Sequence, residues 1–209
     1  MPKLQNTTYL KNYFCNHPTQ RKTGVAILLA SKLEFQEIDI MRDPQGRYLF
    51  LKGYLNKTCT LASIYVPNKG QAPFLRNILS KLQLFAEGTL ILGGDFNVPL
   101  DLILDSSTGH SSIPQRSIRS IRRAIGDMDL VDCWRTLNPQ TKDYTWYSAL
   151  HNRYSRIDYV FIRQIGLPRL CTARIDPATW SDHGAVHITM ESPLYRPAKW
   201  MCRLNEALL

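Results

Sequence analysis

The chain has 209 residues, of which 44% are hydrophobic and 21% are charged, and it carries a formal net charge of +9. This length and composition fit one globular domain with a sizeable core and are unlike those of a disordered chain. The excess of positive charge indicates a polyanionic partner, with nucleic acid ahead of an anionic membrane surface. No stretch is apolar enough to span a membrane and no apolar run follows the first residues, so we expect a nuclear or cytoplasmic protein that is not secreted.

The cysteines and the motif inventory narrow the classes further. Five cysteines are spread along the chain without a C-x-x-C pair, which predicts reduced thiols rather than a disulfide framework or a zinc site. The sequence also has no internal repeat, no low-complexity tract and no Walker-type phosphate loop.

The first half of the chain is dominated by strand-like runs. Residues 1–22 are polar and irregular, and we expect a loop or a lost edge there. Apolar runs then predict four strands, over residues 25–29, 35–40, 47–55 and 59–65. Turn-forming sequences separate the last three, which therefore form an antiparallel meander. Apolar residues recur at helical spacing over 74–85, which predicts an amphipathic helix laid on a sheet.

The central feature of the sequence is the segment 89–97, in which four apolar or β-branched residues run into two glycines. This pattern predicts a buried strand that stops where the backbone passes close to another group. Asp95 and Asn97 follow, at the kind of strand end where α/β enzymes present their chemistry. A carboxylate and a carboxamide there suit a base and a neutral hydrogen-bond donor. An Asx-turn without a chemical role explains them equally well.

The second half begins with a polar loop and a helix predicted over residues 114–125, with isoleucines on one side and arginines on another. We interpret Arg116 and Arg119 on this helix as part of a solvated face, and we keep a phosphate contact as the second interpretation. Residues 130–137 predict a short helical piece. Three strands close the domain, over residues 144–148, 156–162 and 186–190.

Polar residues with chemical potential lie at or just inside the predicted strand ends, so two sheets packed face to face would bring them to one rim. They are Tyr65, Asn68, Asp95, Asn97, Asp158, Asp182 and His183. A buried Asp158 is suited to accept from the imidazole of His183 and to fix its tautomer. Asp182 offers a hard oxygen to an ion such as Mg²⁺. Taken singly, each residue also has an ordinary structural role, such as a loop cap, a core tyrosine or a partner of an arginine.

Four motifs follow one another along the chain: Y-V-P-N at residues 65–68, G-G-D-F-N at 93–97, S-R-I-D-Y at 155–159 and S-D-H at 181–183. In this order and spacing they resemble the endonuclease/exonuclease/phosphatase superfamily, which includes apurinic/apyrimidinic endonucleases and pancreatic deoxyribonuclease. The run T-G-V-A-I-L-L, the Y-T-W-Y-S…Y-S-R-I-D-Y hairpin and the tail at 200–209 are similar to the endonuclease domain of long interspersed, non-LTR retrotransposon polyproteins. The resemblance covers nearly the whole chain.

The resemblance implies a four-layered α/β/β/α sandwich of two packed mixed sheets, and hydrolysis of DNA phosphodiesters that depends on Mg²⁺ or Mn²⁺. It implies that Asp95 activates or positions the attacking water. By the same resemblance, Asn97 and Tyr65 bind the scissile phosphate, and Asn68 lies near the phosphate backbone.

The remaining implied roles concern the histidine, the metal and the recognition of DNA. His183 would stabilise the phosphorane and be oriented by Asp158, while Asp182 would contribute to the metal site. In the retrotransposon group a hairpin loop probes the target DNA. It corresponds here to Leu150, His151, Asn152, Arg153 and Tyr154.

The chain departs from the family pattern at its start. The family begins with a strand ending in Asn, a helix, and a strand ending in a Q-E-T motif whose Glu is the principal metal ligand. Neither motif is present, and residues 1–4 resemble the stretch shortly after that Glu. We therefore expect an N-terminally truncated domain that lacks the first strands and helix and has an incomplete set of metal ligands. Impaired folding or activity is expected unless another segment or partner completes the sheet.

The sequence thus predicts one domain over residues 1–194 and a linker over 195–209. The expected partners are DNA and, in the ancestral polyprotein, a reverse transcriptase domain, with no membrane and no small-molecule cofactor. The first functional hypothesis is a Mg²⁺-dependent DNA endonuclease derived from a non-LTR retrotransposon. The alternatives are a non-catalytic remnant that binds nucleic acid through its basic surface and a phosphatase of the same superfamily.

Overall fold

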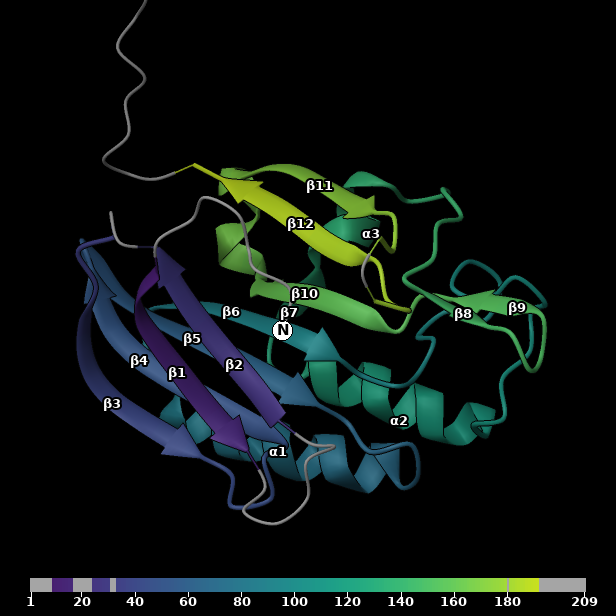
Figure 1. Ribbon diagram of the computed structural model, residues 1–209, viewed down its shortest axis with the longest axis horizontal. Helices are drawn as coiled ribbons and strands as arrows, with labels where there is room; N and C mark the ends of the chain where they lie inside the picture. Colours follow the sequence, from purple (N-terminus) through teal and green to yellow (C-terminus); the bar gives the residue numbers. More distant parts are fainter. Residues whose placement is uncertain (1–8, 17–23, 31–32, 180, 192–209) are drawn as a thin grey trace, which may run out of the picture.

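A computed structural model describes residues 9–16, 24–30, 33–179 and 181–191 (Figure 1). At its centre lies a six-stranded sheet in the order β3–β4–β5–β6–β10–β7. Only β5 and β6 pair in parallel, and every other neighbouring pair is antiparallel. The strands are β3 (Gln36–Arg42), β4 (Tyr48–Leu55), β5 (Lys57–Tyr65), β6 (Thr89–Asp95), β7 (Leu130–Asp132) and β10 (Asp158–Arg163).

The two faces of this sheet carry different layers, as the alternation of side chains along β4 shows. Tyr48 and Phe50 belong to a large core that includes residues of the two long helices. Leu49 and Leu51 point to the other face and join a smaller core with residues of the first two strands. All four side chains are buried, so β4 is packed on both faces.

Two amphipathic helices cover the first face. They are α1 (Gln71–Phe85) and α2 (Gln115–Gly126), which lie side by side at the bottom of Figure 1. Each buries residues at helical spacing and leaves a polar surface outward. The sequence predicts both helices within three residues of their observed ends.

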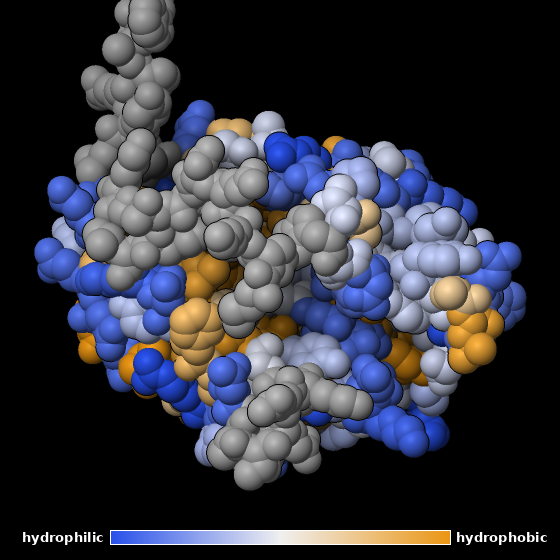
Figure 2. Space-filling model, in the orientation of Figure 1, coloured by the Kyte–Doolittle hydropathy of each residue, from blue (hydrophilic) through white to orange (hydrophobic). Residues whose placement is uncertain are grey.

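Two separate hairpins cover the second face. The first is β1 (Tyr9–Asn16) with β2 (Gly24–Ala30), and the second is β11 (Leu170–Asp176) with β12 (Ala185–Met190). Within the described ranges, β2 and β12 each pair with one strand only. A largely apolar groove of about 320 Å³ lies between the hairpins, with Leu29, Leu61, Ile91 and Met190 in its walls. Figure 2 shows apolar surface in the middle of this side of the molecule.

A small third hairpin projects from one end of the molecule, at the right of Figure 1. It consists of β8 (Trp146–Ser148) and β9 (Arg153–Ser155). The remaining elements are the short helix α3 (Cys133–Leu137), which contacts β10 and β11, and the 3₁₀ helix η1 (Gln164–Arg169).

The predicted fold class, an α/β sandwich, is confirmed. The six-stranded sheet and the two helices on its first face form two of the expected layers. The meander β3–β4–β5 is as predicted. Where a second sheet is expected, the described residues form two hairpins. On their side, the helical layer is represented among the described residues only by α3 and η1.

Several local predictions are wrong. The first 22 residues are not all loop, because β1 pairs along its length with β2 and this pairing outweighs the polar asparagines of β1. The segment 130–137 begins as strand β7, since it pairs with β10, and only then becomes helical. Strands β9 and β11 are absent from the prediction. The three residues of β9 are too few to show a period, whereas the prediction overlooks a regular alternation of apolar and polar residues in β11.

Two further expectations concern the C-terminal linker and membrane-spanning segments. The predicted linker over residues 195–209 lies outside the described residues. Among the described helices, none has the length and apolar character that crossing a membrane requires.

Candidate active site

Asp95 and Asn97 form a tight turn at the carboxyl end of β6. The Oδ1 atom of Asp95 accepts the backbone N–H of Asn97 at 2.8 Å, which is an Asx-turn. The backbone of Asn97 is left-handed, with φ of 51°, and asparagine tolerates this conformation better than most residues. The turn fixes the Asp95 carboxylate at the sheet edge, so the structural and the chemical interpretations of this residue hold together.

The side-chain amide of Asn97 is itself engaged. Its Nδ2 donates to the Val66 carbonyl at 2.7 Å and to Oδ2 of Asp95 at 3.2 Å. Both N–H groups therefore point into the turn, and the carboxamide oxygen is the part left for an incoming group. The predicted donation from Asn97 to a phosphate would require one of these two bonds to be exchanged.

Gly94 explains why a glycine directly precedes Asp95. Its φ is 146°, and a Cβ atom at this position would lie 1.9 Å from the carbonyl oxygen of Ile64 on β5. Only glycine allows the two parallel strands to approach in this way. The close approach confirms the prediction that the backbone passes near another group here. Strand β6 ends at Asp95, which the sequence prediction places just beyond the strand and which is its last residue.

Asp158 and His183 form the second part of the site. Asp158 opens β10 and is the antiparallel register partner of Asp95, which places the two carboxyl groups on neighbouring strands. The Nδ1 atom of His183 lies 2.8 Å from Oδ2 of Asp158. With Nδ1 facing the carboxylate, Nε2 of the same ring is left to face a substrate.

Thr145 holds the histidine segment against the start of β10. Its carbonyl accepts the backbone N–H of Gly184 at 2.7 Å, next to His183. Its Oγ1 accepts the N–H groups of Ile157 and Asp158, both at 3.1 Å. Thr145 is 2% exposed. The sequence prediction missed this positioning residue, although a hydroxyl inside an aromatic, strand-like run is a signal that could have drawn attention to it.

The three ionisable groups of the site influence one another. Burial and the neighbouring Asp158 carboxylate raise the pKa of Asp95 to about 6. The hydrogen bond that His183 donates to the Asp158 carboxylate raises the pKa of His183 above its usual value. The site therefore combines a carboxylate of unusually high basicity with an imidazole that is readily protonated, which is the pairing that acid–base chemistry near neutral pH needs.

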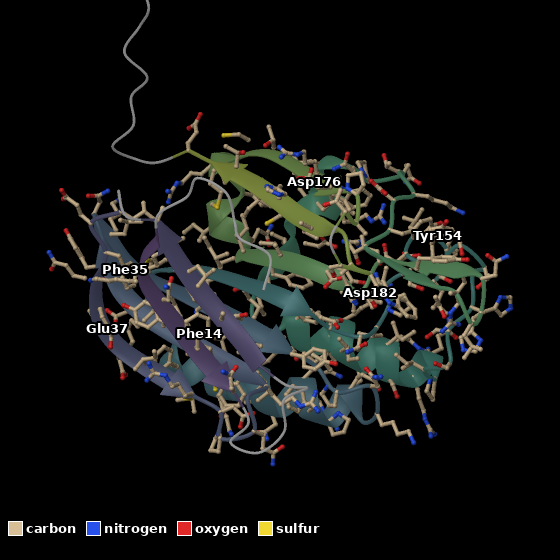
Figure 3. All side chains as sticks on the ribbon, viewed as in Figure 1. Phe14, Phe35, Glu37, Tyr154, Asp176 and Asp182 are labelled. Atoms are coloured by element: carbon tan, nitrogen blue, oxygen red, sulfur yellow. The ribbon has the colours of Figure 1, made fainter. Side chains whose placement is uncertain are left out.

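The same three residues could hold a metal ion. Ligand atoms of Asp95, Asp158 and His183 all lie within 4.8 Å of one another. Two close carboxylates fit a hard divalent cation that completes its coordination with water and phosphate oxygens, since Mg²⁺ is usually held by one or two carboxylates. Asp182, the predicted ligand, has an exposed side chain and is not part of this group. Its charge still contributes to the pKa of both Asp95 and His183, and Figure 3 places it beside the ends of β6 and β10.

The remaining predicted phosphate ligands lie around this centre. Tyr65 ends β5 and is the parallel register partner of Asp95. The Arg47 guanidinium lies 5.0 Å from the centre of the Tyr65 ring. Asn68 follows in the next loop, where its carbonyl accepts from the side chain of Gln71.

A cavity of about 210 Å³ opens next to Asn97 and Asn68. Trp146 and Ile157 form apolar parts of its wall, and Arg153 and His110 form polar parts. The Nε atom of Arg153 is buried and has no hydrogen-bond partner among the described residues. A cavity with an aromatic wall, amide groups and an unsatisfied guanidinium suits part of a nucleotide. The sequence prediction missed Trp146, Ile157 and His110, since their approach depends on the fold.

The predicted DNA-probing residues separate into two groups. Arg153 lines the cavity, whereas Leu150, His151 and Asn152 lie at the tip of the β8–β9 hairpin. Leu150 is 88% exposed. Tyr154 lies on the same hairpin (Figure 3). Its ring stacks with that of Tyr144 and is tilted against that of Tyr147.

A buried ion network is centred on Arg156, two residues before Asp158. Arg156 is 1% exposed, and its guanidinium contacts Asp105 at 2.9 Å and Asp132 at 2.6 Å. The hydroxyl of Tyr159 donates to the carbonyl of Val98 at 3.0 Å, which ties the loop after Asn97 to β10. Asp158 therefore has His183 as its partner, while the neighbouring arginine is used elsewhere.

Comparison with known proteins relates the sequence of this chain to a family. The sequence pattern of the Endonuclease/Exonuclease/phosphatase family matches residues 2–183. The chain is also 28% identical, over 220 residues, to the Transposon TX1 uncharacterized 149 kDa protein of Xenopus laevis. That alignment covers 100% of this chain but only 16% of the length of the transposon protein.

Solved structures share the fold at low sequence identity. AP endonuclease LMAP from Leishmania major superposes with a TM-score of 0.68 at 18% identity, covering 87% of this chain and 71% of that one. An AP endonuclease from Archaeoglobus fulgidus gives 0.68 at 18%, covering 87% and 80%. The 3'-5' exonuclease NExo from Neisseria meningitidis gives 0.63 at 20%, covering 81% and 75%. With a nuclease-type fold and a family match over most of its length, the chain belongs to the endonuclease/exonuclease/phosphatase family.

Proposed function

We propose that this chain is a metal-dependent phosphodiesterase that nicks one strand of DNA, as part of a transposon-derived protein. The observation that carries the proposal is the juxtaposition of Asp95, Asp158 and His183 at one sheet edge, beside a cavity suited to a nucleotide. The net charge of +9 supports a polyanionic substrate. The family match and the transposon relative support the same reaction class.

Each residue has a separable role in this proposal. Asp95, with a pKa of about 6, is largely ionised at pH 7 and takes a proton from the attacking water or orients it. His183, held through Nδ1 by Asp158, donates from Nε2 to a phosphate oxygen as negative charge develops there. The hydroxyl of Tyr65 donates a hydrogen bond to the same phosphate, and Asn97 holds Asp95 in place through its backbone N–H.

A divalent cation such as Mg²⁺ or Mn²⁺, held by Asp95 and Asp158 with help from Asp182, would neutralise part of the charge of the phosphate. The raised pKa of Asp95 supports this assignment, because burial and the neighbouring Asp158 carboxylate both disfavour the charged form of Asp95, and a cation would offset this cost.

The hairpin and cavity supply substrate contacts in the proposal. Arg153 and Asn68 bind the nucleotide next to the scissile bond, while Leu150, His151, Asn152 and Tyr154 contact the DNA groove from the hairpin tip. An exposed leucine at such a tip is suited to act as an apolar wedge between bases.

The test is nicking of supercoiled plasmid by the purified chain in Mg²⁺, with substitutions of two histidines and one aspartate. His183→Ala and Asp95→Asn should each lower the nicking rate by about 10³-fold. His187→Ala is the matched control, since His187 also pairs with an aspartate, Asp176 at 3.0 Å, but lies on β12 away from the site. It should leave the rate unchanged.

Two other results would overturn the proposal. A folded chain that binds DNA with salt-sensitive affinity but never nicks it, with binding indifferent to His183→Ala, would support a non-catalytic nucleic-acid-binding remnant. One observation favours that alternative. Both side-chain N–H groups of Asn97 already donate to Val66 and Asp95, so neither is free to bind a phosphate. Turnover of a soluble phosphomonoester without cleavage of DNA would instead support a phosphatase.

A further inference from the structure

The outer surface of the two long helices is unusually rich in positive charge. Together α1 and α2 contain six arginines and lysines and no aspartate or glutamate. Four of the six lie on α2, where every one is exposed: Arg116, Arg119, Arg122 and Arg123. We call these four residues the α2 arginine face.

The α2 arginine face lacks the partners that other arginines of the molecule have. Among the described residues, no carboxylate lies within ion-pair distance of Arg116, Arg119 or Arg122. Arg123 approaches Asp127 only at 4.0 Å, with both side chains largely exposed. By contrast, Arg135 and Arg156 are held by buried carboxylates. The charge of the α2 arginine face is therefore left uncompensated within the described residues.

Helix stability accounts for Arg123, which lies in the last turn of α2 four residues before Asp127, but not for Arg116 and Arg119. Arg116 lies in the first turn, where a cation opposes the helix dipole, and that turn has no acidic residue. Arginines three and four positions apart also repel one another by a few tenths of a kcal/mol per pair. Alternation with acidic residues, the usual pattern of a solvated helix, would remove both costs.

The α2 arginine face begins three residues after the segment that lines the cavity of the candidate active site. His110 and Ile113, a few residues before α2, line the cavity beside Asn97. From Arg116 to Arg123 the helix advances about 10 Å, at about 1.5 Å per residue. The face thus forms a basic track that leads away from the cavity along the helical layer.

We infer that the α2 arginine face binds the phosphate backbone of the duplex that flanks the cleavage site. The inference rests on the proposed function, since it assigns to the same DNA a second contact outside the catalytic edge. A phosphate track of this kind adds affinity and orientation without reading the sequence of bases. A solvated helix face, the ordinary interpretation of these arginines, would make no such contact, so the two interpretations can be told apart by measuring DNA binding.

The salt dependence of DNA binding tests the inference, because each phosphate contact contributes about 0.9 to the slope of log affinity against log salt. The double variant Arg116→Gln/Arg119→Gln should reduce that slope by about 2 for a duplex DNA probe. Arg42→Gln/Lys57→Gln removes the same charge from exposed positions on β3 and β5 and should reduce it much less. Glutamine retains good helix propensity, and Arg116→Lys/Arg119→Lys should preserve the slope.

The outcomes separate this inference from the proposed function. An unchanged slope in the Arg116→Gln/Arg119→Gln variant, or an equal loss in the control pair, would overturn the inference even if the wild-type chain nicks plasmid. A reduced slope for DNA in a chain that cannot nick would support the basic track and count against the nuclease. A reduced slope for duplex RNA alone would overturn the assignment to flanking DNA.

Discussion

The two faces of the central sheet differ in how completely they are covered, and the candidate site draws on both. On one face α1 and α2 seal a continuous core. On the other, two hairpins leave an apolar groove between them. Asp95 and Asp158 belong to the central sheet, whereas His183 lies between the two strands of the β11–β12 hairpin. The carboxylates are thus fixed by the well-packed part of the molecule, and the histidine depends on the less completely covered part.

Matched leucine substitutions should give the largest difference between the faces. Leu92 on β6 is fully buried in the core under the helices, while Leu29 on β2 is 7% exposed and lines the groove. Leu92→Ala should lower the free energy of unfolding by about 4–5 kcal/mol, because its site cannot collapse. Leu29→Ala should cost about 2 kcal/mol, since water can reach the space it leaves. Urea denaturation measures both, and equal losses would mean that the two faces are equally well packed.

The pH dependence of stability should reveal the crowded carboxylates by a smaller effect. The pKa of Asp95 is about 6 when folded, against about 3.9 for an unfolded aspartate. The folded chain therefore binds this proton more tightly, and the resulting stability is lost as pH rises from about 4 to about 6. Asp95→Asn should remove that loss and make the metal-free protein about 1–2 kcal/mol more stable than wild type at pH 8.

The measurement is urea denaturation of both proteins in chelator across this pH range. Asp101→Asn is a suitable control, because Asp101 caps a local turn away from His183 and should not alter the slope with pH. A difference in stability between wild type and Asp95→Asn that stays constant between pH 4 and 6 would contradict the raised pKa of Asp95, and with it the burial of this carboxyl group and its crowding by Asp158.

The parts of the fold that follow from the sequence are those whose pattern is local. The helices α1 and α2 and the meander of β3, β4 and β5 repeat their apolar residues with the right period, so their existence is predicted correctly. β1 is missed because its polar and irregular sequence becomes a strand only by pairing with β2, whereas β11 is missed although its apolar and polar residues do alternate. β7 is missed because three residues are too few to show a period.

The site divides in the same way. Asp95, Asp158 and His183 are expected to converge because polar residues at strand ends meet at one edge, and the structure places them within a few ångströms. Thr145, Trp146 and the Arg156 network escape prediction, since their contacts span long separations in sequence and no local pattern announces them. The roles of the site residues in chemistry remain predictions for experiment.

Titration of His183 tests the central claim most directly, because it reports the Asp158 contact without requiring metal, substrate or activity. In NMR spectra of the metal-free chain, the pKa of His183 should lie above that of an ordinary histidine, and Asp158→Asn should lower it. If His183 instead titrates at the ordinary histidine value in both proteins, the histidine is not held by Asp158 and the proposed active site is not assembled.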